Sequence, residues 1–357
     1  MKHTHLDMKI SDALKSDISY LLSLDSIHWG KLRNSTVLIT GATGLVGGLL
    51  VRVLAAASAV HDLDIRLIAT GRSAAKGDTL STECGVEFIA GDIRKPLPEG
   101  AIPSSIDYIF HCAAITKSAD MVAKPVDVIS TETDGTYAIL NLARQKHCRS
   151  LVYLSSMEVY GQANQREVSE GDLGYIDLSS TRSCYPEGKR FCELLCLAYA
   201  AQYGVPVKIA RLAMTFGAGT PKDKNNMRVA SQFVHKALAN EDIELHTLGN
   251  SIANCCYTAD AVCGLLIILL DGKDGEAYNV ANPLASATIR EMAELVTNKV
   301  CNGIIKVIVN VPKDIEKRGY APDVIYTLNA DKLKKLGWVP KFGLEDMYRQ
   351  MIADWRG

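Results

Sequence analysis

Residues Thr36–Thr40 form a short β-branched run, and three glycines spaced three residues apart follow it directly. These are Gly41, Gly44 and Gly47, and an apolar helical pattern begins within them. Strand, glycine turn and helix in this order are typical of a dinucleotide-binding unit. The first glycine permits the turn, the second admits a pyrophosphate, and the third brings helix and strand together. The alternative is an ordinary strand-to-helix turn without a ligand.

The chain continues with short apolar runs between helical patterns. The further candidate strands lie at residues 65–70, 86–90, 107–113, 151–156 and 207–212. The clearest helical patterns between them are at 124–147 and 186–203. Strands that alternate with helices predict a parallel sheet with helices on both faces, which is a doubly wound α/β fold of the Rossmann type.

The pattern changes after Gly219, so we divide the chain into three parts. Residues 1–35 are a helical extension with an amphipathic stretch at 10–24, and residues 36–219 are the dinucleotide-binding domain. Residues 220–357 mainly form a smaller lobe, from which 258–281 returns to the first domain. Open α/β sheets bind ligands at the carboxyl ends of their strands, where we expect the lobe to lie.

Composition excludes several kinds of partner. The 357 residues include 39 Lys and Arg against 40 Asp and Glu, for a formal net charge of −1. This balance argues against nucleic acid and against an anionic membrane surface. The longest apolar run, at 261–270, is about half as long as a membrane-spanning helix. The first residues lack the apolar core of a secretion signal, so a cytoplasmic protein is expected.

The 10 cysteines do not form a recognisable framework. No CxxC pair is present, and most of the cysteines lie in apolar surroundings. We therefore interpret them as free thiols in a reducing compartment and expect no metal site.

The start of the helix after the glycine turn predicts the phosphate contacts of a dinucleotide. Free backbone N–H groups and the helix dipole favour an anion there. The candidate cofactor residues in this turn are Gly41, Thr43, Gly44, Leu45, Val46 and Gly47.

The end of the second candidate strand bears on the choice of cofactor. NAD enzymes usually place a carboxylate there, whereas an arginine accommodates the 2′-phosphate of NADP. This chain has Arg72, with Lys76 nearby, and no acidic residue. NADP or mixed use is favoured, although a solvated surface arginine is the alternative. Asp92, after the third strand, is a candidate contact of the adenine amino group.

Tyr185 and Lys189 predict proton-transfer chemistry. They are four residues apart at the start of a predicted helix, so they share a face. A free tyrosine has a pKa of about 10, and a neighbouring ammonium favours the phenolate. Tyr185 is therefore a candidate base toward an alcohol. Ser155 and Ser156 end the preceding strand and offer a hydroxyl to orient the same alcohol.

Taken together, these motifs resemble the extended short-chain dehydrogenase/reductase family, specifically its NAD-dependent nucleotide-sugar epimerases, dehydratases and decarboxylases. The resemblance covers nearly the whole chain from residue 36 onward. It is carried by TGATGLVG, GDI, HCAA, SSMEVYG, YPEGKR, RLAMTFGAG, RVASQFVHKAL, YTADAV and LGWVPKFGLEDM.

The resemblance implies a Rossmann domain with an interleaved substrate lobe, NAD or NADP as cofactor, and a nucleotide sugar as substrate. It also implies a homodimer formed through the helices at 124–147 and 186–203. Ser156 takes the hydroxyl position, Tyr185 is the base and Lys189 its partner. The GDI and HCAA motifs add further cofactor contacts at Ile93, Ala113 and Ala114. Tyr185 and Lys189 are expected to contact the cofactor as well.

Departures from the family pattern bear on the reaction. Family dehydratases carry an acidic aspartate directly after the catalytic hydroxyl residue, where this chain has Met157. Glu158 follows and is a candidate base near C5 of the sugar. Family decarboxylases and several epimerases use an arginine seven residues before the aspartate that matches Asp260, and this position is Ala253. Met214 replaces a further family asparagine.

These departures favour an epimerase that passes through a 4-keto sugar. The alternatives are a decarboxylase acting on UDP-glucuronate, a 4,6-dehydratase, an NADP-dependent sugar reductase and a non-catalytic cofactor-binding regulator. Arg228 and Arg318 are candidates to replace the lost contacts to the substrate's diphosphate. Each is otherwise a solvated arginine, and a substrate without a nucleoside diphosphate would also explain the losses.

Overall fold

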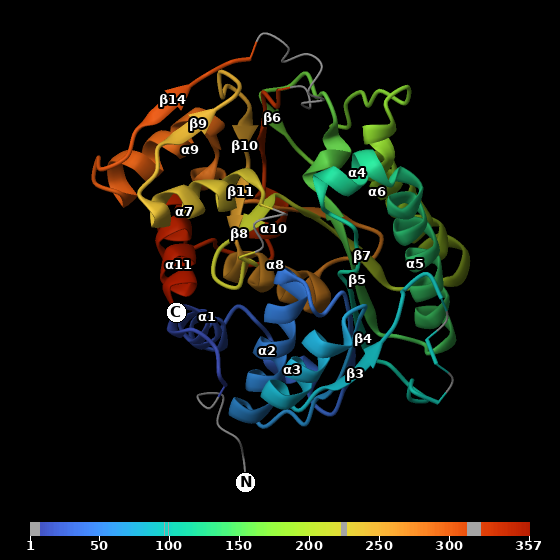
Figure 1. The fold of residues 1–357 in the computed structure, drawn as a ribbon. Coiled ribbons are helices and arrows are strands. Elements are labelled where there is room, and N and C mark those ends of the chain that lie inside the picture. The colour runs from blue at the N-terminus through green and yellow to red at the C-terminus, as the bar shows by residue number, and fades with distance from the viewer. Residues whose placement is uncertain (1–7, 96, 99, 223–226, 313–322) are drawn as a thin grey trace.

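A seven-stranded parallel sheet forms the centre of the computed structural model, which describes residues 8–95, 97–98, 100–222, 227–312 and 323–357 (Figure 1). In spatial order its strands are β12 (Ala277–Val280), β7 (Val207–Leu212), β5 (Ser150–Ser156), β4 (Tyr108–His111), β1 (Thr36–Thr40), β2 (Arg66–Gly71) and β3 (Glu87–Ala90). The winding direction reverses between β1 and β4, which makes this the topological switch point of a doubly wound sheet. The predicted fold class is confirmed.

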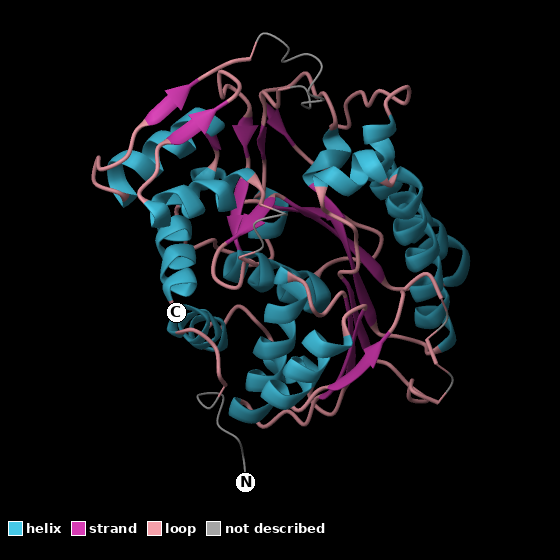
Figure 2. Ribbon diagram, in the orientation of Figure 1, coloured by secondary structure: helices cyan, strands magenta, loops and turns pink. Residues whose placement is uncertain are grey.

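Helices cover both faces of this sheet (Figure 2). Side chains alternate along a strand, so β1 sends Val37 and Ile39 into one layer and Leu38 into the other. The first layer contains α2 (Leu45–Val60), α3 (Ala74–Cys84) and α8 (Thr258–Asp271). The second layer contains α5 (Pro125–Gln145) and α6 (Cys184–Tyr203). The runs that the sequence analysis assigned to strands and helices thus lie in the central sheet and its covering layers.

Small ribbons and helices lie beside the sheet, and most of them come from the C-terminal part of the chain. The ribbons pair β8 (Met214–Phe216) with β11 (Cys255–Tyr257), β9 (Ile243–Leu245) with β14 (Val307–Val309), β10 (Ile252–Ala253) with β13 (Ala287–Thr288), and β6 (Glu167–Val168) with β15 (Thr327–Leu328). The remaining helices are α4 (Ser118–Ala123), α7 (Val229–Ala239), α9 (Ile289–Leu295), α10 (Asp331–Lys334) and α11 (Leu344–Arg356). The C-terminal helix α11 is 13 residues long.

The N-terminal helix α1 (Asp12–Leu22) packs against α2, α8 and α11. Ile18 and Leu21 are buried, as the amphipathic pattern predicts. Asp17 is also buried, and burial raises its pKa to about 7 although its carboxylate accepts a hydrogen bond from the Tyr257 hydroxyl at 2.8 Å. Asp354 of α11 accepts hydrogen bonds from the Ser11 hydroxyl and the Gly219 N–H, so it connects both chain ends to the loop after β8.

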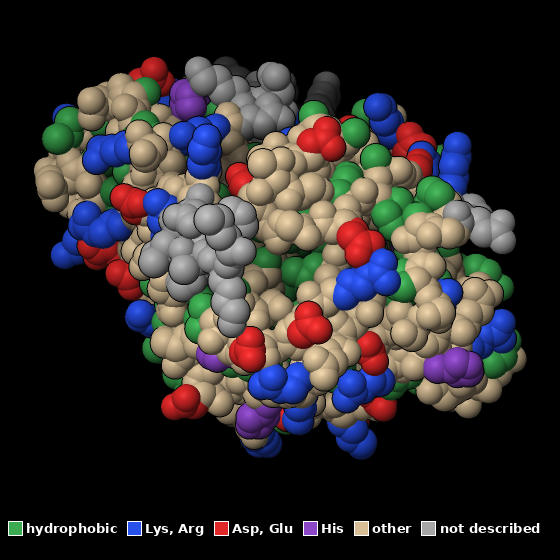
Figure 3. Space-filling view, turned by 90° about the horizontal axis from the view of Figure 1, so that it is seen from below, with side chains coloured by type: hydrophobic (Ala, Val, Ile, Leu, Met, Phe, Trp, Pro, Cys, Tyr) green, Lys and Arg blue, Asp and Glu red, His purple; other side chains and the backbone are tan. Residues whose placement is uncertain are grey.

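None of the helices in the described residues is both long and apolar enough to cross a membrane. All 10 cysteines are described and none forms a disulfide. No group of three or more His, Cys, Asp or Glu within the described ranges lies close enough to hold a metal ion. On the face shown in Figure 3, acidic and basic side chains are interspersed.

Candidate active site

The glycine turn brings the ends of β1 and β4 and the start of α2 into close contact. Gly41 has φ of +64°, and a Cβ there would lie 2.8 Å from the backbone nitrogen of Ala113. A Cβ on Gly47 would lie 2.5 Å from the carbonyl oxygen of Gly41. Both positions therefore require glycine, which is the physical reason for the motif. The turn and Ala113 meet at the switch point, where a doubly wound sheet binds its ligand.

The first turn of α2 presents unpaired backbone donors. Gly44 is the N-cap residue and provides no side-chain hydrogen bond to the helix. By helix geometry, the N–H groups of Leu45, Val46 and Gly47 have no intrahelical acceptor. A phosphate is the natural partner for such groups at the positive end of the helix dipole.

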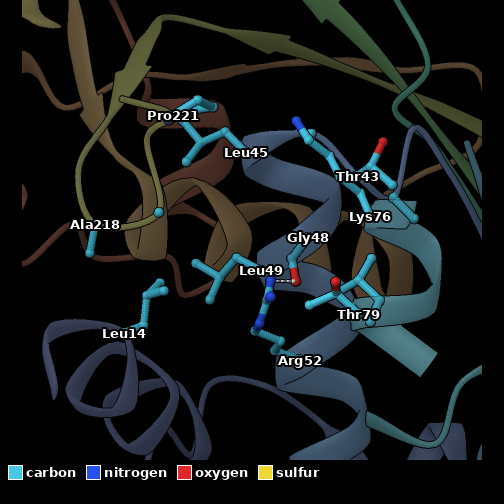
Figure 4. Close-up of a pocket in the computed structure, with 14 residues that line it drawn as sticks. Leu14, Thr43, Leu45, Gly48, Leu49, Arg52, Lys76, Thr79, Ala218 and Pro221 are labelled. Carbon is cyan, nitrogen blue, oxygen red and sulfur yellow. Dashed lines mark hydrogen bonds between the residues drawn. The ribbon is translucent and has the colours of Figure 1, made fainter. Parts of the chain in front are cut away.

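A cavity of about 240 Å³ adjoins this turn (Figure 4). Its lining includes Thr43 and Leu45 from the turn, Lys76 from α3, and Leu14 from α1. Lys76 reaches from α3 toward Thr43 and the start of α2 (Figure 4). Among the described residues, none accepts a hydrogen bond from the Lys76 ammonium or forms an ion pair with it. This cation is therefore available to a ligand.

The end of β2 has no carboxylate to meet a ribose. Thr43 lies against Gly71, because a Cβ on Gly71 would be 3.1 Å from the Thr43 hydroxyl oxygen. Arg72 follows immediately and is exposed. Thr43, Arg72 and Lys76 therefore provide hydroxyl and cationic groups around one strand end.

Asp92 is engaged by a neighbouring residue. The Arg94 guanidinium donates to its carboxylate at 2.6 Å and also binds Asp127 at 3.0 Å. Hydrogen bonds from Arg94 hold the pKa of Asp92 below its usual value. Ile93 is buried, and a Cβ on Gly135 of α5 would lie 2.9 Å from its side chain. The predicted adenine contact Asp92 thus has an intramolecular partner in Arg94.

The structure brings Tyr185, Lys189 and Ser156 together. Tyr185 lies in the first turn of α6, and its side chain is 6% exposed. The Lys189 Nζ atom is 5.8 Å from the centre of the Tyr185 ring. Ser156 ends β5, accepts a hydrogen bond from the Glu158 N–H at 3.2 Å, and interacts with Tyr185 through its hydroxyl.

The electrostatics of Tyr185 are balanced between opposing groups. Burial raises the pKa of its phenol, while the Lys189 ammonium and the Ser156 hydroxyl lower it. Glu132 and Glu158 act in the same direction as burial, and the pKa lies above its usual value. The Lys189 ammonium and the Ser156 hydroxyl are therefore the groups that favour the phenolate form of Tyr185.

Glu158 forms an ion pair with Arg182 at 3.1 Å, and both side chains are partly exposed. Arg182 belongs to a short 3-10 turn that leads directly into α6. The sequence analysis missed this arginine, although its place three residues before Tyr185 was a usable signal. Glu158 therefore faces a cation as well as the tyrosine.

The other predicted substrate residues have different outcomes. Arg228 is the N-cap residue of α7 and donates to the Thr116 carbonyl at 3.1 Å, close to the carboxyl end of β4. Arg318 lies outside the described residues. Ala253 is 3% exposed within β10, and Met214 lies in β8.

Two buried polar residues near the site were also missed. Glu132 of α5 lies 2.8 Å from the Lys189 Nζ atom. His111, at the end of β4, bridges the hydroxyls of Thr40 and Thr136, and burial lowers its pKa to about 3. A carboxylate on the otherwise buried face of the predicted 124–147 helix was the signal for Glu132.

Comparison with known families decides the assignment. The model of the NAD dependent epimerase/dehydratase family matches residues 37–281. The chain belongs to this family. The predicted family is thereby confirmed. A nicotinamide dinucleotide is also confirmed as the cofactor, because this family is NAD-dependent.

Proteins of similar sequence or structure align with almost the whole of this chain. UDP-glucuronic acid decarboxylase 5 of Arabidopsis thaliana is 32% identical over 328 residues, which cover 90% of each chain. UDP-glucuronic acid decarboxylase 1 of Danio rerio is 31% identical over 88% of this chain and 71% of its own. Among solved structures, UDP-glucose 4-epimerase of Thermotoga maritima aligns with a TM-score of 0.74 and 20% identity, covering 90% of this chain and 98% of that one. The dTDP-glucose 4,6-dehydratase of Streptomyces venezuelae, solved with NAD bound, has a TM-score of 0.72 and 22% identity over 90% and 97%.

Proposed function

We propose that this protein oxidises the C4 hydroxyl of a nucleotide-linked sugar, with Tyr185 as the base. The observation that carries the proposal is the meeting of Tyr185, Lys189 and Ser156 at the end of β5. β5 is the neighbour of β4, whose carboxyl end contacts the glycine turn. A substrate alcohol beside Tyr185 would therefore lie along the edge where the cofactor is expected.

In the proposed mechanism, Ser156 orients the substrate hydroxyl and Tyr185 removes its proton. Lys189 stabilises the phenolate that is needed for this step. A bound oxidised nicotinamide supplies a hydride acceptor and a positive charge. Residues Leu45 to Gly47 would hold the cofactor's pyrophosphate through their N–H groups, and Ala113 and Ala114 would provide further contacts next to the glycine turn.

Among the outcomes open to a 4-keto sugar, we propose epimerisation. Met157 has no proton to transfer, which argues against the elimination step of the family dehydratases. Ala253 is buried and uncharged where the family decarboxylases use an arginine. An epimerase needs only the return of the hydride to the opposite face of the sugar.

Decarboxylation of UDP-glucuronate is the second candidate. The relatives at 31–32% identity are UDP-glucuronic acid decarboxylases. Glu158 and Arg182 would then flank the reacting part of the sugar, with Arg182 as the cation nearest to a substrate carboxylate.

A product assay separates these reactions. The protein is incubated with NAD and, in separate tubes, UDP-glucose, UDP-galactose and UDP-glucuronic acid, and the products are identified by NMR. Interconversion of the two hexoses supports the epimerase, and loss of carbon dioxide to give a UDP-pentose supports the decarboxylase. In parallel tubes supplied with NADPH instead of NAD, its stoichiometric consumption, followed by absorbance, would indicate a reductase. Tight cofactor binding without turnover on a broad panel would indicate a regulator.

The cation pair at the end of β2 predicts a preference for NADP. We expect the double substitution Arg72→Ala/Lys76→Ala to weaken NADP binding by at least about tenfold, because charge-assisted phosphate contacts are lost. NAD affinity should change little, and calorimetric titration with both cofactors measures the difference. Arg66→Ala is the control, since Arg66 lies at the opposite end of β2 and pairs with Glu87. Equal losses for both cofactors would contradict the proposal.

The exposed faces of α5 and α6 predict a homodimer. Their apolar side chains Ile129, Tyr137, Phe191 and Leu194 are between 43% and 64% exposed. We expect Leu194→Glu to convert a dimer into a monomer in light scattering, because a carboxylate would be buried without a partner. Leu284→Glu is the matched control, since Leu284 is 90% exposed in the C-terminal part. A wild-type protein that is monomeric at micromolar concentrations would refute the interface.

A further inference from the structure

Helix α5 places a carboxylate directly behind the proposed base. Glu132 is 1% exposed, and its Oε2 atom lies 2.8 Å from Nζ of Lys189, which is 2% exposed. The Tyr153 hydroxyl donates to the same carboxylate at 3.3 Å. The second oxygen, Oε1, is buried and has no hydrogen-bond partner among the described residues. Such a carboxylate is costly to bury, so its charge calls for an explanation.

Glu132 restricts the orientation of the Lys189 ammonium. An ammonium has three N–H donors. Glu132 Oε2 accepts one of them, and the Leu154 carbonyl accepts another at 2.7 Å. The Tyr153 ring covers a further side, with its centre 4.7 Å from Nζ. One N–H group of Lys189 therefore remains to point toward Tyr185 and the expected cofactor site.

Glu132 also opposes the effect of the Lys189 charge on Tyr185. Burial has the largest effect on the pKa of the Tyr185 phenol and raises it. The Lys189 ammonium lowers this pKa, and Glu132 raises it further. Burial would lower the pKa of Lys189, but Glu132 and then Tyr185 counteract this and the pKa is raised. Burial raises the pKa of the Glu132 carboxyl, and Lys189 and Tyr153 counteract this. The carboxylate and the ammonium thus act on the phenol in opposite directions.

We infer that Glu132 is a positioning residue, which orients the Lys189 ammonium toward Tyr185 and offsets the effect of its charge on the phenol. The inference rests on the proposed role of Tyr185 as the base.

Titration of Tyr185 in the cofactor-free, full-length protein tests this inference. The protein is labelled with carbon-13 at the tyrosine ring Cζ, and the Tyr185 signal is assigned by its absence in Tyr185→Phe. In Glu132→Gln an acceptor for Lys189 remains but the negative charge is gone. We expect the titration midpoint of Tyr185 to move to lower pH, with the phenolate fraction below the midpoint rising about tenfold. An unchanged midpoint would overturn the inference.

Glu193→Gln provides the matched control. Glu193 is a buried carboxylate on α6 that pairs with Arg211 at 2.6 Å, so its neutralisation should leave the Tyr185 midpoint in place. A shift as large as that of Glu132→Gln would refute a specific role for Glu132.

A double variant covers the case in which Glu132→Gln does not fold. Glu132→Gln/Lys189→Met removes both charges and leaves neither unpaired. If the charges compensate one another, the Tyr185 midpoint stays near the wild-type value. A large rise, as expected from losing an uncompensated cation, would overturn the inference. Because the titration needs no substrate, a protein inactive on every nucleotide sugar would refute the proposed function and leave this result readable.

Discussion

Tyr185→Phe should lower turnover of the substrate by about 10²- to 10⁴-fold, the usual contribution of a positioned acid or base. The substitution removes one hydroxyl from a buried ring and keeps the ring's packing in the first turn of α6. It leaves the glycine turn untouched, so cofactor affinity and thermal stability should stay close to the wild-type values. Steady-state rates at saturating cofactor, together with calorimetric cofactor binding, measure both quantities.

Tyr199→Phe is the matched control for this prediction. Tyr199 is a buried tyrosine on the same helix, and its ring packs against Tyr137 and Tyr203 rather than against the site. Its loss of a hydroxyl should leave turnover nearly unchanged. If Tyr185→Phe retained full turnover on an identified substrate, the proposed mechanism would be wrong.

Arg211→Met should lower the free energy of unfolding by about 3–5 kcal/mol, the usual cost of breaking a buried ion pair. Arg211, near the end of β7, donates to the Glu193 carboxylate at 2.6 Å and 2.9 Å, and both side chains are almost inaccessible to solvent. It also donates to the Tyr160 hydroxyl at 3.0 Å. Methionine fills the space but leaves Glu193 charged and unpaired. Denaturant unfolding followed by circular dichroism measures the loss.

The double substitution Arg211→Met/Glu193→Leu separates the pair from the packing. With both charges removed, we expect most of the lost stability to return, since buried pairs are often replaceable by apolar residues. A double variant as unstable as Arg211→Met alone would show that the methionine disrupts packing. Glu193 also accepts a hydrogen bond from the Ser155 hydroxyl, beside Ser156, so the pair fixes the strand end that carries the proposed site.

Local patterns predicted the sheet because they depend on near neighbours. The β-branched run of β1 and the glycine spacing after it are visible within a dozen residues, and the backbone geometry at Gly41 explains the motif. The same holds for Tyr185 and Lys189, which share a helix face at a separation of four residues. Ribbon strands of two or three residues, such as β10, are too short to show a period.

Contacts between distant segments account for what the sequence analysis missed. Glu132 and Lys189 lie on different helices, and no local pattern shows that α5 and α6 pack together. Arg228 meets the Thr116 carbonyl across 112 positions of sequence. The attachment of α1 likewise depends on Tyr257 and Asp354, far along the chain. Such pairings are settled by the fold as a whole, after the elements have formed.

The position of β12 and α8 has a consequence for synthesis on the ribosome. β12 is the seventh strand of the central sheet, and α8, buried from Thr258 to Leu269, packs against β5, β7 and α2. Until translation has passed residue 280, β7 remains an open edge and one apolar layer of the sheet lacks its cover. A nascent chain that ended at residue 219 would therefore expose aggregation-prone surface. The sheet can gain its last strand only when most of the protein has been made.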